Sequence, residues 1–300
     1  MTGSHSLQRY AWLSVAAALA TMALKLLAWW WTGSVGLLSD ALESSINLIA
    51  AMLAVMALRF AERPADRSHP YGHDKIEYFA SGFEGGLVML AAFAIGWAAV
   101  DRLLQPQPLQ AVDLGLLLTI AASAINLVVG RVLIRVGREH RSPTLEADGH
   151  HLMTDVWTSA VVLVALIGVP LTGWLWLDPV IALLMAGHIL ITGLRLMRRS
   201  ASGLLDEALD EDLVKQLQLV LNKHTPAPLH WHALRTRRSG RRAYARVHVL
   251  VPGAWTMQQA HDLAERIEAE VRQVQPSLAL SIHLEPLEDD RAHADFDALE

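Results

Sequence analysis

The sequence predicts a membrane protein, with an all-α bundle of six transmembrane helices followed by a C-terminal cytoplasmic α+β domain in the order α-β-β-α-β. The chain is 53% apolar and 18% charged, and the apolar residues are concentrated in the first two hundred positions. A spanning helix needs roughly 20 apolar residues. Six stretches meet this requirement, at about 9–31, 36–60, 80–104, 112–136, 147–169 and 178–198.

Basic residues orient these helices. They follow the second, fourth and sixth stretches as three groups: Arg59, Arg63, Arg67 and Lys75; Arg131, Arg135, Arg138 and Arg141; Arg195, Arg198 and Arg199. The opposite turns, near 32–35 and 170–177, have no Lys or Arg, and Arg102 is the one basic residue on that side. Because positive charge stays on the cytoplasmic side, both termini and the soluble domain are predicted to be cytoplasmic.

The remainder of the chain is predicted to form a small soluble domain. The predicted boundaries are 1–203 for the membrane domain, 204–287 for a cytoplasmic metal-binding regulatory domain, and 288–300 for an acidic, disordered tail. Within the soluble domain we expect helices at 210–224 and 257–273 and strands at 230–237, 242–251 and 278–284, with a Ser-Gly turn joining the first two strands. This order places both helices on one face of a three-stranded sheet.

Two of the apolar stretches carry polar residues at one shared spacing. The pattern D-x-x-Z-x-x-x-Z is formed by Asp40, Glu43 and Asn47 in the second stretch and by Asp148, His151 and Asp155 in the fifth. Its recurrence three helices later indicates an internal repeat. Residues at i and i+4 share a helix face. Four metal ligands are therefore predicted to converge from two facing helices: Glu43, Asn47, His151 and Asp155.

The alternative is that these groups serve only helix packing. A charged side chain within a membrane helix is costly and indicates function by default, which favours a metal site for the four predicted ligands. For Asp40 and Asp148, which we expect nearer the cytoplasmic end, packing and function are both open. His150 points about 100° away from its neighbour His151, and is expected only to line the site.

Histidines outside the apolar stretches suggest further metal sites. The chain has no cysteine, which excludes thiolate ligands and disulfides. The segment between the second and third stretches contains Asp66, His69 and His73 at a spacing suited to a metal site in a loop. The soluble domain contains a larger set on several predicted elements, namely His230, His232, His248, His261, His283 and Glu285. A solvated basic loop and exposed surface histidines are the alternative interpretations.

Five sequence runs together resemble the cation diffusion facilitator family of metal/proton antiporters. They are S-V-G-L-L-S-D-A-L-E-S at 34–44, H-P-Y-G-H-D-K-I-E at 69–77, A-D-G-H-H-L-M-T-D at 147–155, D-P at 178–179 and H-A-L-R-T-R at 232–237. The resemblance covers nearly the whole chain except the tail. It implies a homodimer with one transport site in each protomer between helices two and five, a loop metal site, and a binuclear metal site in the cytoplasmic domain.

The resemblance also assigns residues to these sites by position. Glu43, Asn47, His151 and Asp155 match the transport site, and Asp66, His69 and His73 match the loop site. The cytoplasmic cluster is matched by His232, His248, His261, His283 and Glu285. Lys75 and Asp206 match a charge pair that locks the two membrane halves at the dimer interface.

This sequence departs from the family pattern at three positions. Zinc-transporting members usually have His or Asp where Glu43 stands, Asp where Asn47 stands, and Asp where Glu285 stands. The transport site therefore offers three oxygen ligands and one imidazole. More oxygen favours harder ions such as manganese or ferrous iron, whereas imidazole suits zinc, iron, cobalt and nickel.

The predicted function is proton-coupled efflux of divalent transition-metal cations from the cytoplasm by alternating access. Zinc is the expected ion, with iron, manganese, cobalt, nickel and cadmium as alternatives. The predicted location is a bacterial inner membrane, and the predicted partners are a second copy of the chain, metal ions, protons and the lipid bilayer, with no nucleic acid. An enzyme is not expected, because nothing resembles an H-E-x-x-H site. The remaining alternative is a non-transporting membrane metal sensor or scaffold.

Overall fold

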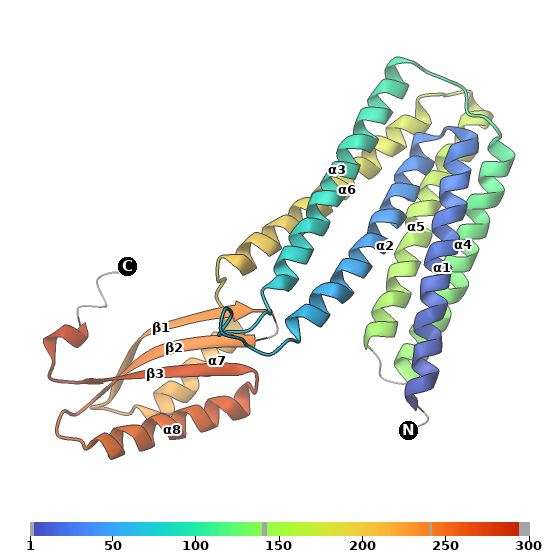
Figure 1. Ribbon diagram of the computed structural model, residues 1–300. Helices are drawn as coiled ribbons and strands as arrows, with labels where there is room; N and C mark the ends of the chain where they lie inside the picture. The colour runs from blue at the N-terminus through green and yellow to red at the C-terminus, as the bar shows by residue number, and fades with distance from the viewer. Residues whose placement is uncertain (1–2, 140–142, 241, 294–300) are drawn as a thin grey trace. The chain divides into compact units, whose positions relative to one another are not determined.

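A computed structural model of the chain describes residues 3–139, 143–240 and 242–293 (Figure 1). The chain forms two compact units. The first contains Met1–Val55 and Ser81–Met197, and the second contains Met56–Ala80 and Arg198–Glu300. The second unit therefore includes the loop between the second and third helices and the ends of the helices that flank it. This loop contacts the soluble domain, since Tyr244 Oη donates a hydrogen bond to the Tyr71 carbonyl oxygen at 3.3 Å.

Six long helices confirm the predicted membrane spans. They are α1 (Gly3–Thr32), α2 (Val35–Ala61), α3 (Ile76–Leu104), α4 (Val112–Glu139), α5 (Pro143–Thr172) and α6 (Leu177–Leu204). Within the described residues, all six contain segments long and apolar enough to cross a bilayer. Each helix extends beyond the corresponding apolar stretch, because helical hydrogen bonding continues into residues that are too polar for the hydrocarbon core.

Small residues allow close packing between α3 and α6. A Cβ added at Gly85 would lie 3.1 Å from the Gly193 carbonyl oxygen, and one added at Gly193 would lie 2.7 Å from Met89 Cγ. A shared core of alanine and isoleucine side chains continues the contact, including Ala92, Ile95, Ala182, Ala186 and Ile189. Helices in membranes commonly associate by close backbone approach at glycine and alanine, because the hydrophobic effect does not drive apolar helices together in lipid.

Asp178, in the first turn of α6, holds the N-terminus of α2. Its carboxylate accepts hydrogen bonds from Ser34 Oγ at 2.5 Å, Val35 N at 2.9 Å and Gly36 N at 3.3 Å. It thereby satisfies amide groups that a helix start leaves unpaired and places negative charge at the positive end of the helix dipole. A Cβ at Gly36 would lie only 3.0 Å from Asp178 Oδ1. The contact fixes the starts of α2 and α6 at the same level.

The soluble part of the second unit is a three-stranded sheet covered on one face by two helices. Strands β1 (His230–Ser239) and β2 (Arg242–Val251) are antiparallel, β3 (Leu278–Pro286) lies parallel to β2, and the order is β1-β2-β3. Helices α7 (Glu211–His224) and α8 (Met257–Val274) pack on one side of this sheet (Figure 1). The predicted α-β-β-α-β domain is confirmed.

The side chains of β2 separate the two faces of this sheet. Ala243, Ala245, Val247, Val249 and Val251 belong to the core beneath the helices. Successive strand residues point to opposite faces, so His248 lies on the face opposite the helices. Beyond β3, the described chain includes a short 3-10 helix, Asp290–His293, so regular structure extends past the predicted start of the tail. Residues 294–300 of that tail lie outside the described residues.

Candidate metal centres

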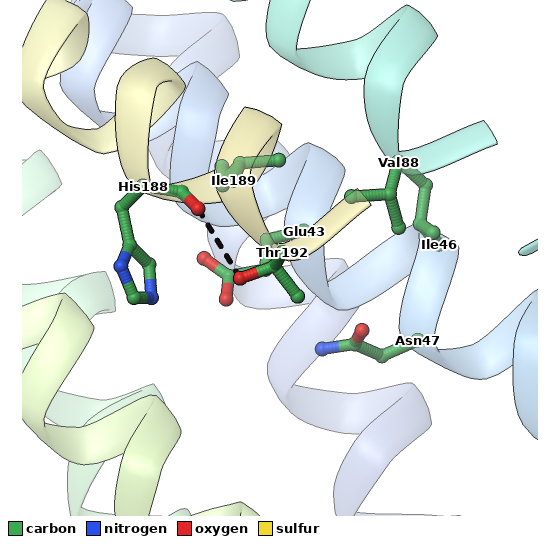
Figure 2. A pocket seen from close by; sticks show the side chains of 7 residues that line it. All are labelled: Glu43, Ile46, Asn47, Val88, His188, Ile189 and Thr192. Atoms are coloured by element: carbon green, nitrogen blue, oxygen red, sulfur yellow. Dashed lines mark hydrogen bonds between the residues drawn. The ribbon is translucent and has the colours of Figure 1, made fainter. Parts of the chain in front are cut away.

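A small pocket lies among α2, α3 and α6. It has a volume of about 50 Å³ and is lined by Glu43, Ile46, Asn47, Val88, His188, Ile189 and Thr192 (Figure 2). Glu43 and Asn47 are one helical turn apart, as predicted, and both reach this pocket. In the part of the chain that the structure describes, Glu43 Oε2 is buried without a hydrogen-bond partner. A buried carboxylate oxygen left unpaired is unfavourable, so the pocket is suited to a cation.

Asp155 belongs to a second buried polar group centred on Lys25 of α1. Lys25 Nζ donates hydrogen bonds to Asp40 Oδ1 at 2.8 Å and Ser44 Oγ at 2.9 Å, and lies 4.0 Å from Asp155 Oδ2. The other oxygen of Asp40 accepts a hydrogen bond from Ser159 Oγ at 2.8 Å. Lys25 is fully buried and Asp40 nearly so. The two charges compensate each other, and the network joins α1, α2 and α5.

Only two of the four predicted transport ligands line the pocket. Glu43 and Asn47 line the pocket near α6, whereas Asp155 lies beside Lys25 and His151 is exposed on α5. Among the described residues, the ligand atoms of Glu43, His151 and Asp155 do not all come within 4.8 Å of one another. Their assignment to one transport site remains a prediction.

The structure corrects the expected depth of Asp40. It lies five residues past the start of α2 at Val35, whereas Arg59 lies in the last turn of the same helix. Asp40 therefore lies toward the end of α2 opposite the basic residues that indicate the cytoplasmic side, contrary to the expectation. The error came from assigning Asp40 and Asp148 to the same end, although α2 and α5 run in opposite directions through the membrane.

Three site residues were missed in the sequence: Lys25, His188 and Thr192. Lys25 and His188 are ionisable residues inside apolar stretches, and intramembrane position alone marks such residues as functional candidates. The predicted transport ligands were chosen from the repeated spacing of polar residues in α2 and α5. Neither Lys25 nor His188 belongs to that pattern, so only a systematic search for isolated ionisable residues would have found them.

The predicted loop site is assembled. Asp66 Oδ1 lies 3.3 Å from His69 Nδ1, and Asp66 Oδ2 lies 3.3 Å from His73 Nε2. The backbone amides of His69 and Ser68 also donate to Asp66 at 2.7 and 2.8 Å, and the His69 amide is the main reason why the pKa of Asp66 lies below its usual range. Asp66 is thus ionised at neutral pH, and the three ligand atoms can converge on one ion.

Four residues of the predicted cytoplasmic cluster also lie close together, on the helix-free face of the sheet. Glu285 Oε2 lies 2.9 Å from His232 Nε2, and Glu285 Oε1 lies 3.1 Å from His248 Nδ1. His283 Nε2 is 3.5 Å from Glu285 Oε1. Register explains this placement, because His232, His248 and His283 are direct cross-strand partners. Burial lowers the pKa of His248, against the opposing effect of Glu285, and the neutral imidazole is the form that binds metal.

His261 lies apart from this cluster. It is exposed on α8, with its Nε2 4.0 Å from Glu265 Oε1, and α8 covers the other face of the sheet. The predicted charge pair does form within one chain, where Lys75 Nζ lies 2.9 Å from Asp206 Oδ1. Its hydrogen bond is the main reason why the pKa of Asp206 is low, and Arg237 adds to the effect. Roles for His261 in metal binding and for Lys75–Asp206 in dimerisation stay predictions.

Comparisons with known proteins cover both units. Residues 11–205 match the cation efflux transmembrane domain, and residues 209–287 match the cation efflux protein cytoplasmic domain. An uncharacterized transporter of Synechocystis, sll1263, is 48% identical over 94% of this chain and 91% of its own length. The cation-efflux pump FieF of Shewanella oneidensis is 32% identical over 92% of each chain.

Two of the solved structures that resemble this chain match less than a third of its length. CzrB in its Zn form is 32% identical, with a TM-score of 0.26 over 29% of this chain and 99% of that one. The metal-bound C-terminal domain of the CzcD transporter from Thermotoga maritima is 24% identical, with a TM-score of 0.25 over 27% of this chain and 99% of that one.

Proposed function

This chain belongs to the cation diffusion facilitator family of cation-efflux transporters, and we propose that it exports divalent transition-metal ions from the cytoplasm in exchange for protons, as a homodimer. It is a membrane protein with a cytoplasmic C-terminal domain, and a transporter rather than an enzyme. Zinc is the ion we expect first, with ferrous iron, manganese, cobalt, nickel and cadmium as alternatives. The exchange proceeds by alternating access.

The observation that carries this proposal is the buried Glu43 carboxylate oxygen within a membrane-spanning helix, for which the described residues offer no hydrogen-bond partner. A scaffold or sensor that used only its cytoplasmic cluster would gain nothing from such a group, which is costly in a membrane. A transporter requires it, because the charge must be free to meet a cation. Asn47, one turn away at the same pocket, adds a neutral oxygen ligand.

His151 and Asp155 complete the proposed transport site from α5. Metal binds when both carboxylates, Glu43 and Asp155, are ionised and His151 is neutral. Rocking of the helices then exposes the site to the far side, where protonation of His151 or Asp155 releases the ion. Lys25 fits this cycle as a fixed counter-charge, because its Nζ is 4.0 Å from Asp155 Oδ2 and supplies positive charge beside that carboxylate while no metal is bound.

The ligand set of α2 is proposed to set metal preference, and two substitutions test this. Asn47→Asp adds a negative charge in a poorly solvated site, so attraction to every divalent ion is expected to rise. Glu43→His replaces oxygen by imidazole nitrogen, and is expected to move preference toward zinc and away from manganese and iron. Metal uptake by proteoliposomes, compared across zinc, iron, manganese, cobalt, nickel and cadmium, measures both effects.

The wild type is expected to carry zinc together with harder ions. If it carries only zinc and cadmium, and neither substitution alters the ranking of metals, then positions 43 and 47 do not select the ion. The exposed position Asp101 on α3 provides the control, since Asp101→Asn changes charge without touching the pocket and should leave the ranking unchanged.

The cytoplasmic cluster of His232, His248, His283 and Glu285 is proposed to bind regulatory metal. Two imidazoles and a carboxylate within 4.8 Å form a donor set suited to zinc and similar ions. Metal that binds one conformation of the domain better than another biases the transporter toward that state. We propose that bound metal tightens the dimer.

Metal binding by this domain can be tested separately, because the sheet and its two helices have their own core. Residues 205–290 alone are expected to melt at a higher temperature when zinc is present. At a zinc concentration of 100 times the Kd, binding should raise the free energy of unfolding by about 2.7 kcal/mol. His232→Ala should abolish the gain. Lys215→Ala is the control and should keep it, because Lys215 is an exposed residue of α7 outside the predicted cluster. A melting temperature that no candidate metal changes would count against the cluster.

A further inference from the structure

His188 is an ionisable side chain near the middle of a membrane-spanning helix. It lies eleven residues past Leu177, the start of α6, and α6 continues to Leu204. At 1.5 Å per residue this is about 16 Å along the helix, close to half the hydrocarbon thickness. The imidazole is exposed at the surface of α6. Such a residue is rare in a membrane helix and normally faces a cavity, a polar partner or an ion.

The depth of His188 matches that of two proposed transport ligands. Asp178 fixes the starts of α2 and α6 at one level through its bonds to the α2 N-terminus. From Val35, Glu43 is eight residues and Asn47 twelve residues along α2, which correspond to about 12 and 18 Å. His188, at about 16 Å, falls between them. All three line the same pocket (Figure 2).

The pocket offers donors from both of these helices. Glu43 supplies a carboxylate with one buried oxygen that has no hydrogen-bond partner among residues 3–139, 143–240 and 242–293. Asn47 supplies an amide oxygen and His188 an imidazole. Thr192 Oγ1 donates its hydrogen to the His188 carbonyl oxygen at 3.2 Å, so the lone pairs of its hydroxyl oxygen remain available. A volume of about 50 Å³ exceeds the roughly 30 Å³ share of one water, which leaves room for a small ion with part of its hydration.

We infer that His188, with Thr192, completes a second cation-binding position against Glu43 and Asn47, separate from the one that His151 and Asp155 form with the same α2 pair. This inference rests on the proposed function of Glu43 and Asn47 as transport ligands. The ligand is a divalent transition-metal ion of intermediate hardness, because the set combines one imidazole with several oxygens. A cation held by α2 can thus be coordinated from α6 as well as from α5.

Cobalt binding to the full-length protein in detergent tests the inference. Asp66→Ala, His232→Ala and His283→Ala first remove the extramembrane sites from the background. In that background, Co²⁺ binding is measured by titration of the visible cobalt absorption. His188→Ala is expected to weaken this binding at least tenfold and to slow Co²⁺ flux in proteoliposomes. Gly187→Ala is the matched control and should change neither, because a Cβ there meets no atom within 4 Å.

The other outcomes separate this inference from the proposed function. Suppose that His188→Ala binds Co²⁺ with wild-type affinity while Glu43→Ala and His151→Ala lose binding. This result would overturn the role of His188 and would still support the proposed transport site. Unchanged binding in Glu43→Ala would instead overturn the proposed site. His188→Gln keeps a polar side chain of similar size, so if the alanine variant fails to fold, wild-type affinity in the glutamine variant overturns the inference and a tenfold loss supports it.

Discussion

Asp155→Ala is expected to abolish metal transport while the protein still folds and dimerises. Asp155 is nearly buried within a membrane-spanning helix and stands one turn from His151. Substitution of residues that merely orient a metal ligand commonly costs 10–100-fold in affinity or activity, so loss of a charged ligand should reduce flux by about 100-fold or more. Lys25 keeps its partner Asp40 in the variant, which is why we expect the fold to survive.

Metal uptake by proteoliposomes measures this effect, with size-exclusion chromatography to confirm an intact dimer. Asp101→Ala removes an exposed carboxylate from α3 and serves as the control. Flux retained by Asp155→Ala at the level of this control would remove Asp155 from the transport site.

Lys25→Met is expected to cause the largest loss of stability. Its ammonium group and the Asp40 carboxylate are 2.8 Å apart, and both side chains are 1% exposed. Removal of one partner leaves a buried charge uncompensated, which typically costs about 3–5 kcal/mol. The double variant Lys25→Met with Asp40→Asn removes both charges, so it should recover most of that loss.

Denaturant unfolding in detergent micelles measures these free energies as a double-mutant cycle. Lys215→Met is the matched control, because Lys215 forms an exposed pair with Glu211 at 3.2 Å, and such surface pairs contribute at most about 1 kcal/mol. Equal stability of Lys25→Met and Lys215→Met would show that the buried pair does not hold α1 against α2. Failure of the double variant to recover would show that Lys25 matters for something other than Asp40.

The fold was predictable because its main signals are long and local. Each membrane helix corresponds to a long, predominantly apolar stretch of sequence, and the bounds predicted for β2, residues 242–251, are those found. The proximity of Asp66, His69 and His73 was predictable for the same reason, since the three residues lie within one short segment.

Contacts between helices were less accessible from the sequence. Spacing shows which residues of α2 share a face, but not which neighbouring helix that face meets. The pairing of Lys25 with Asp40, and the meeting of Glu43 with His188 at one pocket, depend on helix rotation and packing. They required the three-dimensional structure.

The position of His261 on the exposed side of α8 could have been predicted from the sequence. Leu263, Ile267 and Val271 mark the buried face of α8. His261 precedes Leu263 by two positions, which is roughly 200° around the helix. The same periodicity that predicted the helix therefore also placed His261 on its outer surface, away from the sheet and its histidine cluster.

Simultaneous measurement of metal and proton movement in one set of proteoliposomes tests the central claim most directly. Vesicles that contain the purified protein, with a metal-sensitive dye and a pH-sensitive dye inside, are given zinc outside under an imposed pH gradient. We predict that an acidic interior drives zinc inward and that each pulse of zinc makes the interior more alkaline, with both signals lost in Asp155→Ala. Zinc movement without any proton signal, or equal signals in wild type and Asp155→Ala, would contradict proton-coupled export through this site.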